Sequence, residues 1–170
     1  MILVALGANL ASAYGMPEDG LVKARQILEE EHNVRVSAFS SIWVSAPVPI
    51  SDQPWYRNAV MAVETSKAPE KLLAVLNAIE HEFGRDRAFE NKRNAARAMD
   101  LDILAYHDRI FTDPALLIPH PRMHSRGFVL KPLAEIAPQW VHPVLKRSIA
   151  ALVDDLPTDD NLYRLETKVA

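Results

Sequence analysis

Residues 100–106 have the sequence Asp-Leu-Asp-Ile-Leu-Ala-Tyr, in which charged and apolar side chains alternate over the first four positions. Such alternation is typical of a β-strand with one face in the core, because successive side chains point to opposite faces of a sheet. Leu101 and Ile103 are therefore expected to face the core. Asp100 and Asp102 are expected to share the opposite face, with Cα atoms roughly 6.5–7 Å apart. The segment predicts both a buried strand and a pair of neighbouring carboxylates.

The elements on either side of this strand follow from the same two periodicities. Alternating apolar residues indicate strands over residues 2–6, 34–43 and 59–65. Apolar residues at helical spacing indicate helices over residues 21–31, 69–83 and 128–136. The order strand–helix–strand–strand–helix–strand predicts an α+β fold. We expect a ferredoxin-like antiparallel sheet with helices packed against it, that is, a βαββαβ core plus additions.

Connecting segments are expected where proline, glycine or unpatterned charge interrupts these periodicities. They are residues 11–20, 45–54, 84–98 and 111–124. The length of the chain suits one domain over residues 1–170, in which the acidic stretch 156–170 would be a peripheral tail.

Composition excludes several classes of protein. The chain has 170 residues, of which 49% are hydrophobic and 24% charged, and a formal net charge of −3. This charge is too small to indicate a nucleic-acid or membrane partner, and no apolar run approaches the ~20 residues that span a bilayer. The absence of cysteine excludes a disulfide, a thiolate zinc site and a cysteine nucleophile. We expect a cytoplasmic monomer.

The carboxylates of Asp100 and Asp102 are candidates for a magnesium site. Two like charges on one strand face repel each other unless a cation lies between them, and Mg²⁺ usually takes one or two carboxylates together with substrate phosphates. The alternative is the solvated polar face of a half-buried strand, which is the more common origin of an isolated Asp-x-Asp. The preceding segment 85–97 favours the metal site, because it contains five basic residues and two acidic ones. Arginines beside paired carboxylates are what phosphoryl transfer requires.

Two other clusters of polar residues could bind a ligand. His120 lies between Pro119 and Pro121 on stiff backbone, where a neutral imidazole could bond a phosphate or a base. Tyr56 and Asn58 would share one strand face, so a ring and an amide with both donor and acceptor could hold a flat, polar heterocycle. Each residue also has a purely structural alternative, in packing or capping.

Taken in order, these segments resemble the hydroxymethyl-dihydropterin pyrophosphokinase family. The matching segments extend from residue 3 to about 138 and are Leu6-Gly7-Ala8-Asn9-Leu10, Asp52-Gln53-Pro54, Tyr56 with Asn58-Ala59-Val60, Ile79-Glu80, Gly84-Arg85-x-Arg87, Arg97-x-x-Asp100-Leu101-Asp102-Ile103, Pro119-His120-Pro121 and Arg126-x-Phe128-Val129-Leu130. The resemblance implies an ATP-dependent kinase of folate biosynthesis. Such an enzyme transfers pyrophosphate from ATP to 6-hydroxymethyl-7,8-dihydropterin, giving AMP and the pterin diphosphate.

The resemblance also implies roles for individual residues. Two Mg²⁺ ions, bound with ATP, would be held by Asp100 and Asp102, which with Arg85 and Arg97 would form the catalytic set. ATP would be bound by Asn77, Glu80, Arg85, Arg87, Arg97, His120 and Arg126. The pterin would lie between the rings of Tyr56 and Phe128, with Asn58 on its polar edge. The segment Ser45, Ala46, Pro47 and Val48 would complete that pocket.

Two other functions stay open at this point. A ferredoxin-like binding module without catalysis, for instance for RNA, would expose aromatic residues on a basic sheet. Asp100 and Asp102 oppose this, since their charge repels phosphate unless a metal is present. Another magnesium-dependent nucleotidyl transferase on the same scaffold would release inorganic pyrophosphate instead of AMP. Segment 85–97 lacks the Trp-Gly-Pro run common in the resembled family, which leaves open whether Lys92 or Arg93 contacts ATP.

Overall fold

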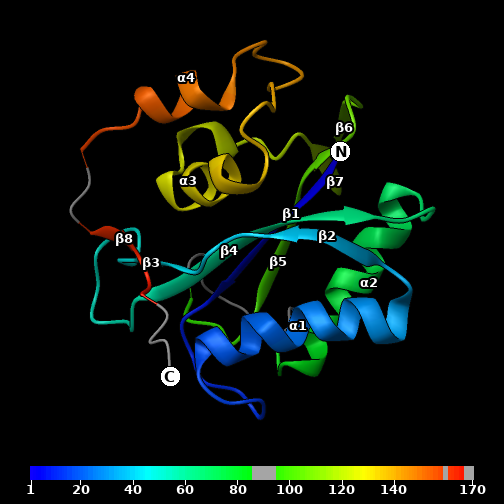
Figure 1. The fold of residues 1–170 in the computed structure, drawn as a ribbon. Coiled ribbons are helices and arrows are strands. Elements are labelled where there is room, and N and C mark those ends of the chain that lie inside the picture. The colour runs from blue at the N-terminus through cyan, green and yellow to red at the C-terminus, as the bar shows by residue number, and fades with distance from the viewer. Residues whose placement is uncertain (86–94, 159–160, 167–170) are drawn as a thin grey trace.

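The structure is a computed structural model that describes residues 1–85, 95–158 and 161–166. Its centre is an antiparallel sheet (Figure 1) of β1 (Ile2–Ala8), β2 (Arg35–Phe39), β3 (Trp43–Ser45), β4 (Tyr56–Glu64), β5 (Asp100–Tyr106) and β8 (Leu162–Arg164). The strand order is β5-β1-β4-β3-β8, and β2 also pairs with β4. Strands β2 and β3 thus follow one another along the same edge of β4. With two helices at the expected places in this order, the predicted ferredoxin-like α+β class is confirmed.

Helices cover both faces of the sheet and make three layers (Figure 1). The helices are α1 (Pro17–His32), α2 (Pro69–Glu82), α3 (Gly127–Ile136) and α4 (Ile149–Asp154). Helices α1 and α2 share one core with β-strand side chains that include Leu101 and Ile103. Helices α3 and α4 share the second core with side chains of the opposite sheet face, Leu104 among them. Leu101 and Ile103 are therefore buried on one face of β5, as predicted from the alternation.

Two boundaries differ from the sequence prediction. The expected loop over residues 11–20 is shorter, because α1 already begins at Pro17. Proline suits the first position of a helix, where its missing N–H has no partner to lose, and the acidic Glu18 and Asp19 suit the first turn. The expected strand over residues 34–43 is divided into β2 and β3. At the break, the Ser40 hydroxyl accepts the N–H of Val60 at 3.0 Å, so a side chain replaces a main-chain partner.

Two segments add short elements that the sequence did not predict. The connection after β5 contains the hairpin of β6 (Phe111–Asp113) and β7 (Leu116–Ile118), followed by the 3₁₀ turn η1 (Met123–Ser125). The described part of the C-terminal tail adds β8 to the sheet beside β3. In the part of the chain that the structure describes, no helix is long and apolar enough to cross a membrane.

Candidate active site

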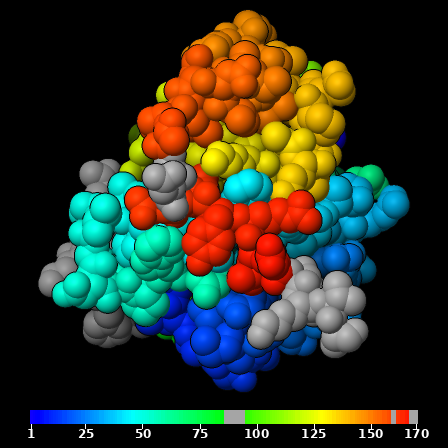
Figure 2. All heavy atoms as spheres, turned by 60° about the vertical axis from the view of Figure 1, so that its left-hand side comes forward, coloured from blue at the N-terminus to red at the C-terminus, as the bar shows by residue number. Residues whose placement is uncertain are grey.

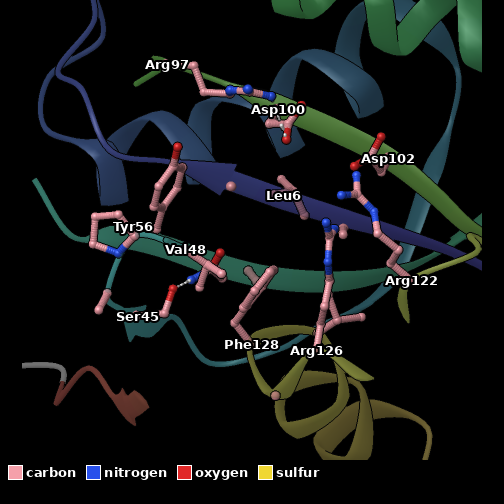
Figure 3. Close-up of a pocket in the computed structure, with 18 of the residues that line it drawn as sticks. Leu6, Ser45, Val48, Tyr56, Arg97, Asp100, Asp102, Arg122, Arg126 and Phe128 are labelled. Carbon is pink, nitrogen blue, oxygen red and sulfur yellow. Dashed lines mark hydrogen bonds and ion pairs between the residues drawn. The ribbon is translucent and has the colours of Figure 1, made fainter. Parts of the chain in front are cut away.

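A cavity of about 800 Å³ lies between the α3 side of the sheet and the start of α3 (Figure 3). Its volume is within the range of about 300–1,000 Å³ typical of small-molecule sites. Of the predicted site residues, those on the sheet or beside it that line this cavity are Ser45, Ala46, Pro47, Val48, Tyr56, Asn58, Asp100 and Asp102. Those on the segments around the sheet are Arg85, Arg97, His120, Arg126 and Phe128. Residues far apart in sequence are thus brought to one place.

The remaining predicted residues lie elsewhere. Asn77 and Glu80 are on α2, outside the residues that line the cavity. Arg87 is outside the described residues, and so are Lys92 and Arg93. Within segment 85–97 the structure describes Arg85 and residues 95–97.

The strand register brings Gly7, Asn58 and Asp100 together at the floor of the cavity. Gly7 of β1 lies opposite Asn58 of β4 on one side and opposite Asp100 of β5 on the other. Because neighbouring side chains in register share a face, the carboxylate of Asp100 and the amide of Asn58 project on the same side, separated by a residue without a side chain. A Cβ atom at Gly7 would lie 3.6 Å from Oδ1 of Asn58. Gly7 therefore leaves the floor open between the two polar groups.

Asp100 is held by two arginines. Nη1 of Arg97 lies 3.2 Å from its Oδ2, and the guanidinium of Arg85 forms an ion pair with its Oδ1. Arg85 also lies 2.6 Å from Oε1 of Glu80, whose side chain is only 1% exposed. The same Glu80 oxygen accepts the N–H of Leu101 at 2.7 Å. Glu80 thus supports the start of β5 and orients Arg85 from behind the cavity.

Asp102 is the carboxylate without a partner. Among the described residues it forms no hydrogen bond and no ion pair, and its side chain is partly buried at the wall of the cavity. Burial, followed by the negative charges of Asp100 and Glu80, raises the pKa of Asp102 to about 6. A cation in the cavity would relieve this repulsion, so the two carboxylates fit a hard divalent ion. No third metal-ligating side chain joins them within the described ranges, so further ligands would have to come from a bound molecule.

The cavity has a basic wall formed by His120, Arg122 and Arg126. Figure 3 shows the side chains of the two arginines extending toward the carboxylate side of the cavity. Neither arginine forms an ion pair with any described residue, and burial and the charge of Arg122 lower the pKa of Arg126. Burial, Arg126 and Arg122 lower the pKa of His120 to about 4, so its ring is neutral at pH 7. Two arginines grouped at one wall without an ion pair favour an anionic ligand. Sequence reasoning missed Arg122, although its place directly after the Pro-His-Pro run was an available signal.

The opposite end of the cavity is aromatic and less charged. Figure 3 shows the rings of Tyr56, from β4, and Phe128, from the start of α3, facing this space. The hydroxyl of Tyr56 donates to the carbonyl oxygen of Ala95 at 3.2 Å. Asn58 is buried, and its Nδ2 donates to Oγ of Ser45 at 2.9 Å and to the carbonyl oxygen of Trp43 at 3.4 Å. The donor side of this amide is already used, which leaves the acceptor Oδ1 for a ligand.

Asn9 is a second residue whose role sequence reasoning missed. Its side chain is buried at the end of β1. Nδ2 donates to Oε1 of Gln53 at 3.2 Å and to the carbonyl oxygen of Pro54 at 3.0 Å, and Oδ1 accepts the N–H of Arg97 at 2.8 Å. One amide thus joins the proline-rich segment to Arg97. An asparagine that ends an apolar strand was the available signal.

The sequence matches the family model described as 7,8-dihydro-6-hydroxymethylpterin-pyrophosphokinase (HPPK) over residues 3–138. It is 40% identical, over 137 residues, to the 2-amino-4-hydroxy-6-hydroxymethyldihydropteridine pyrophosphokinase of Pseudomonas aeruginosa, covering 81% of this chain and 80% of that protein. The protein of the same name from Haemophilus influenzae is 41% identical over 140 residues, covering 82% of this chain and 83% of that protein.

Longer proteins contain a similar region. The folic acid synthesis protein fol1 of Pneumocystis carinii is 36% identical over 94% of this chain, but the chain spans only 20% of that protein's length. The fold is similar to that in the crystal structure of Plasmodium falciparum HPPK-DHPS with pteroate, with a TM-score of 0.73. The match covers 96% of this chain and 47% of that one at 13% identity, and it bears on the fold alone.

Proposed function

Because the chain belongs to the 7,8-dihydro-6-hydroxymethylpterin-pyrophosphokinase family, we propose that it transfers pyrophosphate from ATP to 6-hydroxymethyl-7,8-dihydropterin in folate biosynthesis. The products are AMP and the pterin diphosphate. The observation that carries the proposal is the division of one cavity into two parts. A carboxylate pair facing an unpaired basic wall occupies one part, and two aromatic rings with a buried amide occupy the other.

The proposed reaction defines what the site must do. The hydroxymethyl oxygen of the pterin attacks the β-phosphorus of ATP, and the bond from that phosphorus to the oxygen bridging the α-phosphate breaks. AMP leaves with the bridging oxygen, and the hydroxyl proton is released. Such a transfer depends on aligning the two substrates and on neutralising the charge of the polyphosphate. We assign no general base among the described residues, so positioning and charge neutralisation are the contributions proposed here.

Asp100 and Asp102 would hold Mg²⁺, as two ions bound together with ATP. Two observations support this assignment. The carboxylate of Asp102 has no hydrogen-bond or ion-pair partner among the described residues, and burial, followed by the charges of Asp100 and Glu80, raises its pKa. Bound Mg²⁺ would supply charge neutralisation at the phosphate oxygens. The shortage of further protein ligands fits an ion whose coordination is completed by phosphates and water.

The basic wall would bind the polyphosphate. His120 and Arg126 take this role together with Arg85 and Arg97, and we add Arg122 because it faces the same space without a counter-ion. Arg85 and Arg97 pair with Asp100 in the structure, so phosphate oxygens would compete with that carboxylate for their guanidinium groups. Arg87, outside the described residues, stays a proposal from the motif.

The nucleoside would lie toward α2. Oδ1 of Asn77 is buried and has no hydrogen-bond partner in the described part of the chain. Because Asn77 does not line the cavity, its contact with the nucleoside stays a proposal from the resemblance. Glu80 contributes indirectly, by orienting Arg85.

The pterin would occupy the aromatic end of the cavity. Stacking between Tyr56 and Phe128 suits a flat heterocycle. Oδ1 of Asn58 would accept an N–H from the polar edge of the pterin, because Nδ2 already donates to Ser45 and Trp43. The backbone of residues 45–48 would close the remaining side.

The proposal is tested by incubating the protein with ATP, Mg²⁺ and 6-hydroxymethyl-7,8-dihydropterin and separating the nucleotides by chromatography. AMP and the pterin diphosphate should form in equal amounts, and neither should form when the pterin is omitted. Release of inorganic pyrophosphate would instead indicate a nucleotidyl transferase. Binding of ligands without any turnover would indicate a binding module.

A further inference from the structure

Strand β8 lies behind the aromatic end of the cavity. It pairs with β3 in antiparallel register, so that Leu162 lies opposite Ser45. Just before this pair, the N–H of Ala46 donates to the carbonyl oxygen of Asn161 at 3.1 Å. The backbone of the segment that lines the cavity at residues 45–48 is therefore held at its start by β8.

The side chain of Leu162 also reaches the other wall. It is buried, and a Cβ atom placed on Gly127 would lie only 2.8 Å from its Cδ2. Real Cβ atoms do not approach so closely, so Leu162 packs directly on the backbone at the start of α3. The next residue, Phe128, supplies an aromatic ring of the cavity. Figure 2 shows the C-terminal segment at the surface, in contact with both α3 and the segment after β3.

A third contact connects β8 to the segment that carries Tyr56, the other aromatic ring of the cavity. Tyr163 points to the opposite face of β8, and its ring lies 6.2 Å from that of Trp55, measured between centroids. Trp55 directly precedes Tyr56. Strand β8 thus pairs directly with Ser45, and it contacts the neighbours of Tyr56 and Phe128.

We propose that β8 is a positioning element of the pterin pocket and that Leu162 sets the separation between Phe128 and the segment 45–48. This inference rests on the proposed function, because it concerns how the pterin is held. A side chain fixed between two walls keeps the space between them constant before the ligand arrives, which lowers the ordering cost of binding. The effect is specific to the pterin, since these contacts all lie at the aromatic end of the cavity.

The first test compares two cavity-creating variants. Leu162→Ala should raise the KM for the pterin about tenfold, as expected when a binding group is displaced by a fraction of an ångström to an ångström. The KM for ATP should change less than twofold. Leu28→Ala is the matched control, because Leu28 is also a buried leucine but lies on α1, in the core of the other layer. It should lower the melting temperature and leave both KM values unchanged below that temperature.

The second test uses complementation. Gly127→Ala alone should also raise the KM for the pterin, because its methyl group must displace Leu162. In the double variant Gly127→Ala/Leu162→Ala, the added methyl group occupies space that the leucine has vacated, and the KM for the pterin should lie closer to the wild-type value than in either single variant. Leu162→Val replaces Leu162→Ala if the latter does not fold, as judged by circular dichroism.

Two results would overturn the inference. One is a Leu162→Ala protein that melts early but binds the pterin like the wild type, as a merely structural role requires. The other is a double variant in which the two effects on the KM for the pterin simply multiply. Both results differ from a failure of the proposed function, in which the wild-type protein itself would form no AMP.

Discussion

The backbone N–H of Arg122 donates a hydrogen bond to Nδ1 of His120, across 3.2 Å. Nδ1 therefore offers its lone pair to the backbone, and the proton of the neutral ring is on Nε2. Burial and the charges of Arg126 and Arg122 lower the pKa of His120 to about 4. At neutral pH the ring thus presents a single, uncharged N–H donor.

His120 should titrate near pH 4 in the folded protein, against about 6.5 in the unfolded chain. Because the folded pKa is the lower one, the unfolded chain binds more protons between these values. The neutral ring therefore favours folding fully above pH 6.5, and this contribution is lost as the pH falls toward 4. The C–H resonances of His120 followed by NMR should show this titration. His81, which is exposed on α2, serves as the control ring. A midpoint near 6.5 for His120 would mean that the ring is open to water.

Asp102→Asn should stabilise the metal-free protein and abolish turnover. The pKa of Asp102 is raised in the fold, so its charged form opposes folding increasingly as the pH rises from about 4 through 6. At pH 8 the gain in the free energy of unfolding should be on the order of 1–3 kcal/mol in the absence of metal. Thermal unfolding in a chelator measures it. Asp113→Asn, which changes an exposed carboxylate on β6, should have no such effect.

If both carboxylates bind Mg²⁺, adding this ion should reverse the order of stability between the wild-type protein and the Asp102→Asn variant. With Mg²⁺ and an ATP analogue, the wild-type protein should gain more stability than the Asp102→Asn or Asp100→Ala variants, because ligands stabilise only the state that binds them. Near-normal turnover of either variant at limiting Mg²⁺ contradicts the assignment.

Arg122→Gln should weaken ATP binding about tenfold and reduce its dependence on salt concentration. A charge-assisted bond to phosphate contributes roughly 1.5–3 kcal/mol, and part of this is screened at an open wall. Titration with a nonhydrolysable ATP analogue at two ionic strengths measures both the affinity and its dependence on salt concentration. Arg109→Gln is the control, because the Arg109 guanidinium lies 4.6 Å from the ring centre of Phe111, away from the cavity lining. Equal affinities for wild type and Arg122→Gln would remove Arg122 from the phosphate site.

Asn58→Leu should impair pterin binding severely and leave ATP binding unchanged. The variant removes the acceptor Oδ1, and an unpaired polar edge of a buried ligand costs about 1–3 kcal/mol. Pterin is titrated in the presence of an ATP analogue, alongside a melting curve. Ser45→Ala removes an internal partner of Nδ2 but keeps Oδ1 in place, so its effect on pterin binding should be smaller. Normal pterin affinity with a lowered melting temperature would show that Asn58 only braces β3 against β4.

The parts of the fold with a clear periodicity were predictable. The strand expected over residues 100–106 coincides with β5, and the helix begun by Pro69 is α2. The division of the strand at Ser40 was not, because it depends on a hydrogen bond to Val60, 20 residues away. Strand β8 was missed for a similar reason, since three residues form a strand only where a partner edge is available.

The candidate site was likewise predictable only in part. The shared face of Asp100 and Asp102 follows from alternation along one strand. The pairing of Arg85 with Glu80 and Asp100, and the link made by Asn9, depend on segments brought together only by folding. Spacing along the chain carries no information about such contacts.

Arg85 and Arg97 both hold the carboxylate of Asp100, and they bracket the stretch of chain between them. The two ends of that stretch therefore meet at one side chain. The position of both guanidinium groups therefore depends in part on a single carboxylate. For protein engineering, this makes Asp100 a sensitive position, because one substitution there would remove a shared partner of both guanidinium groups at once.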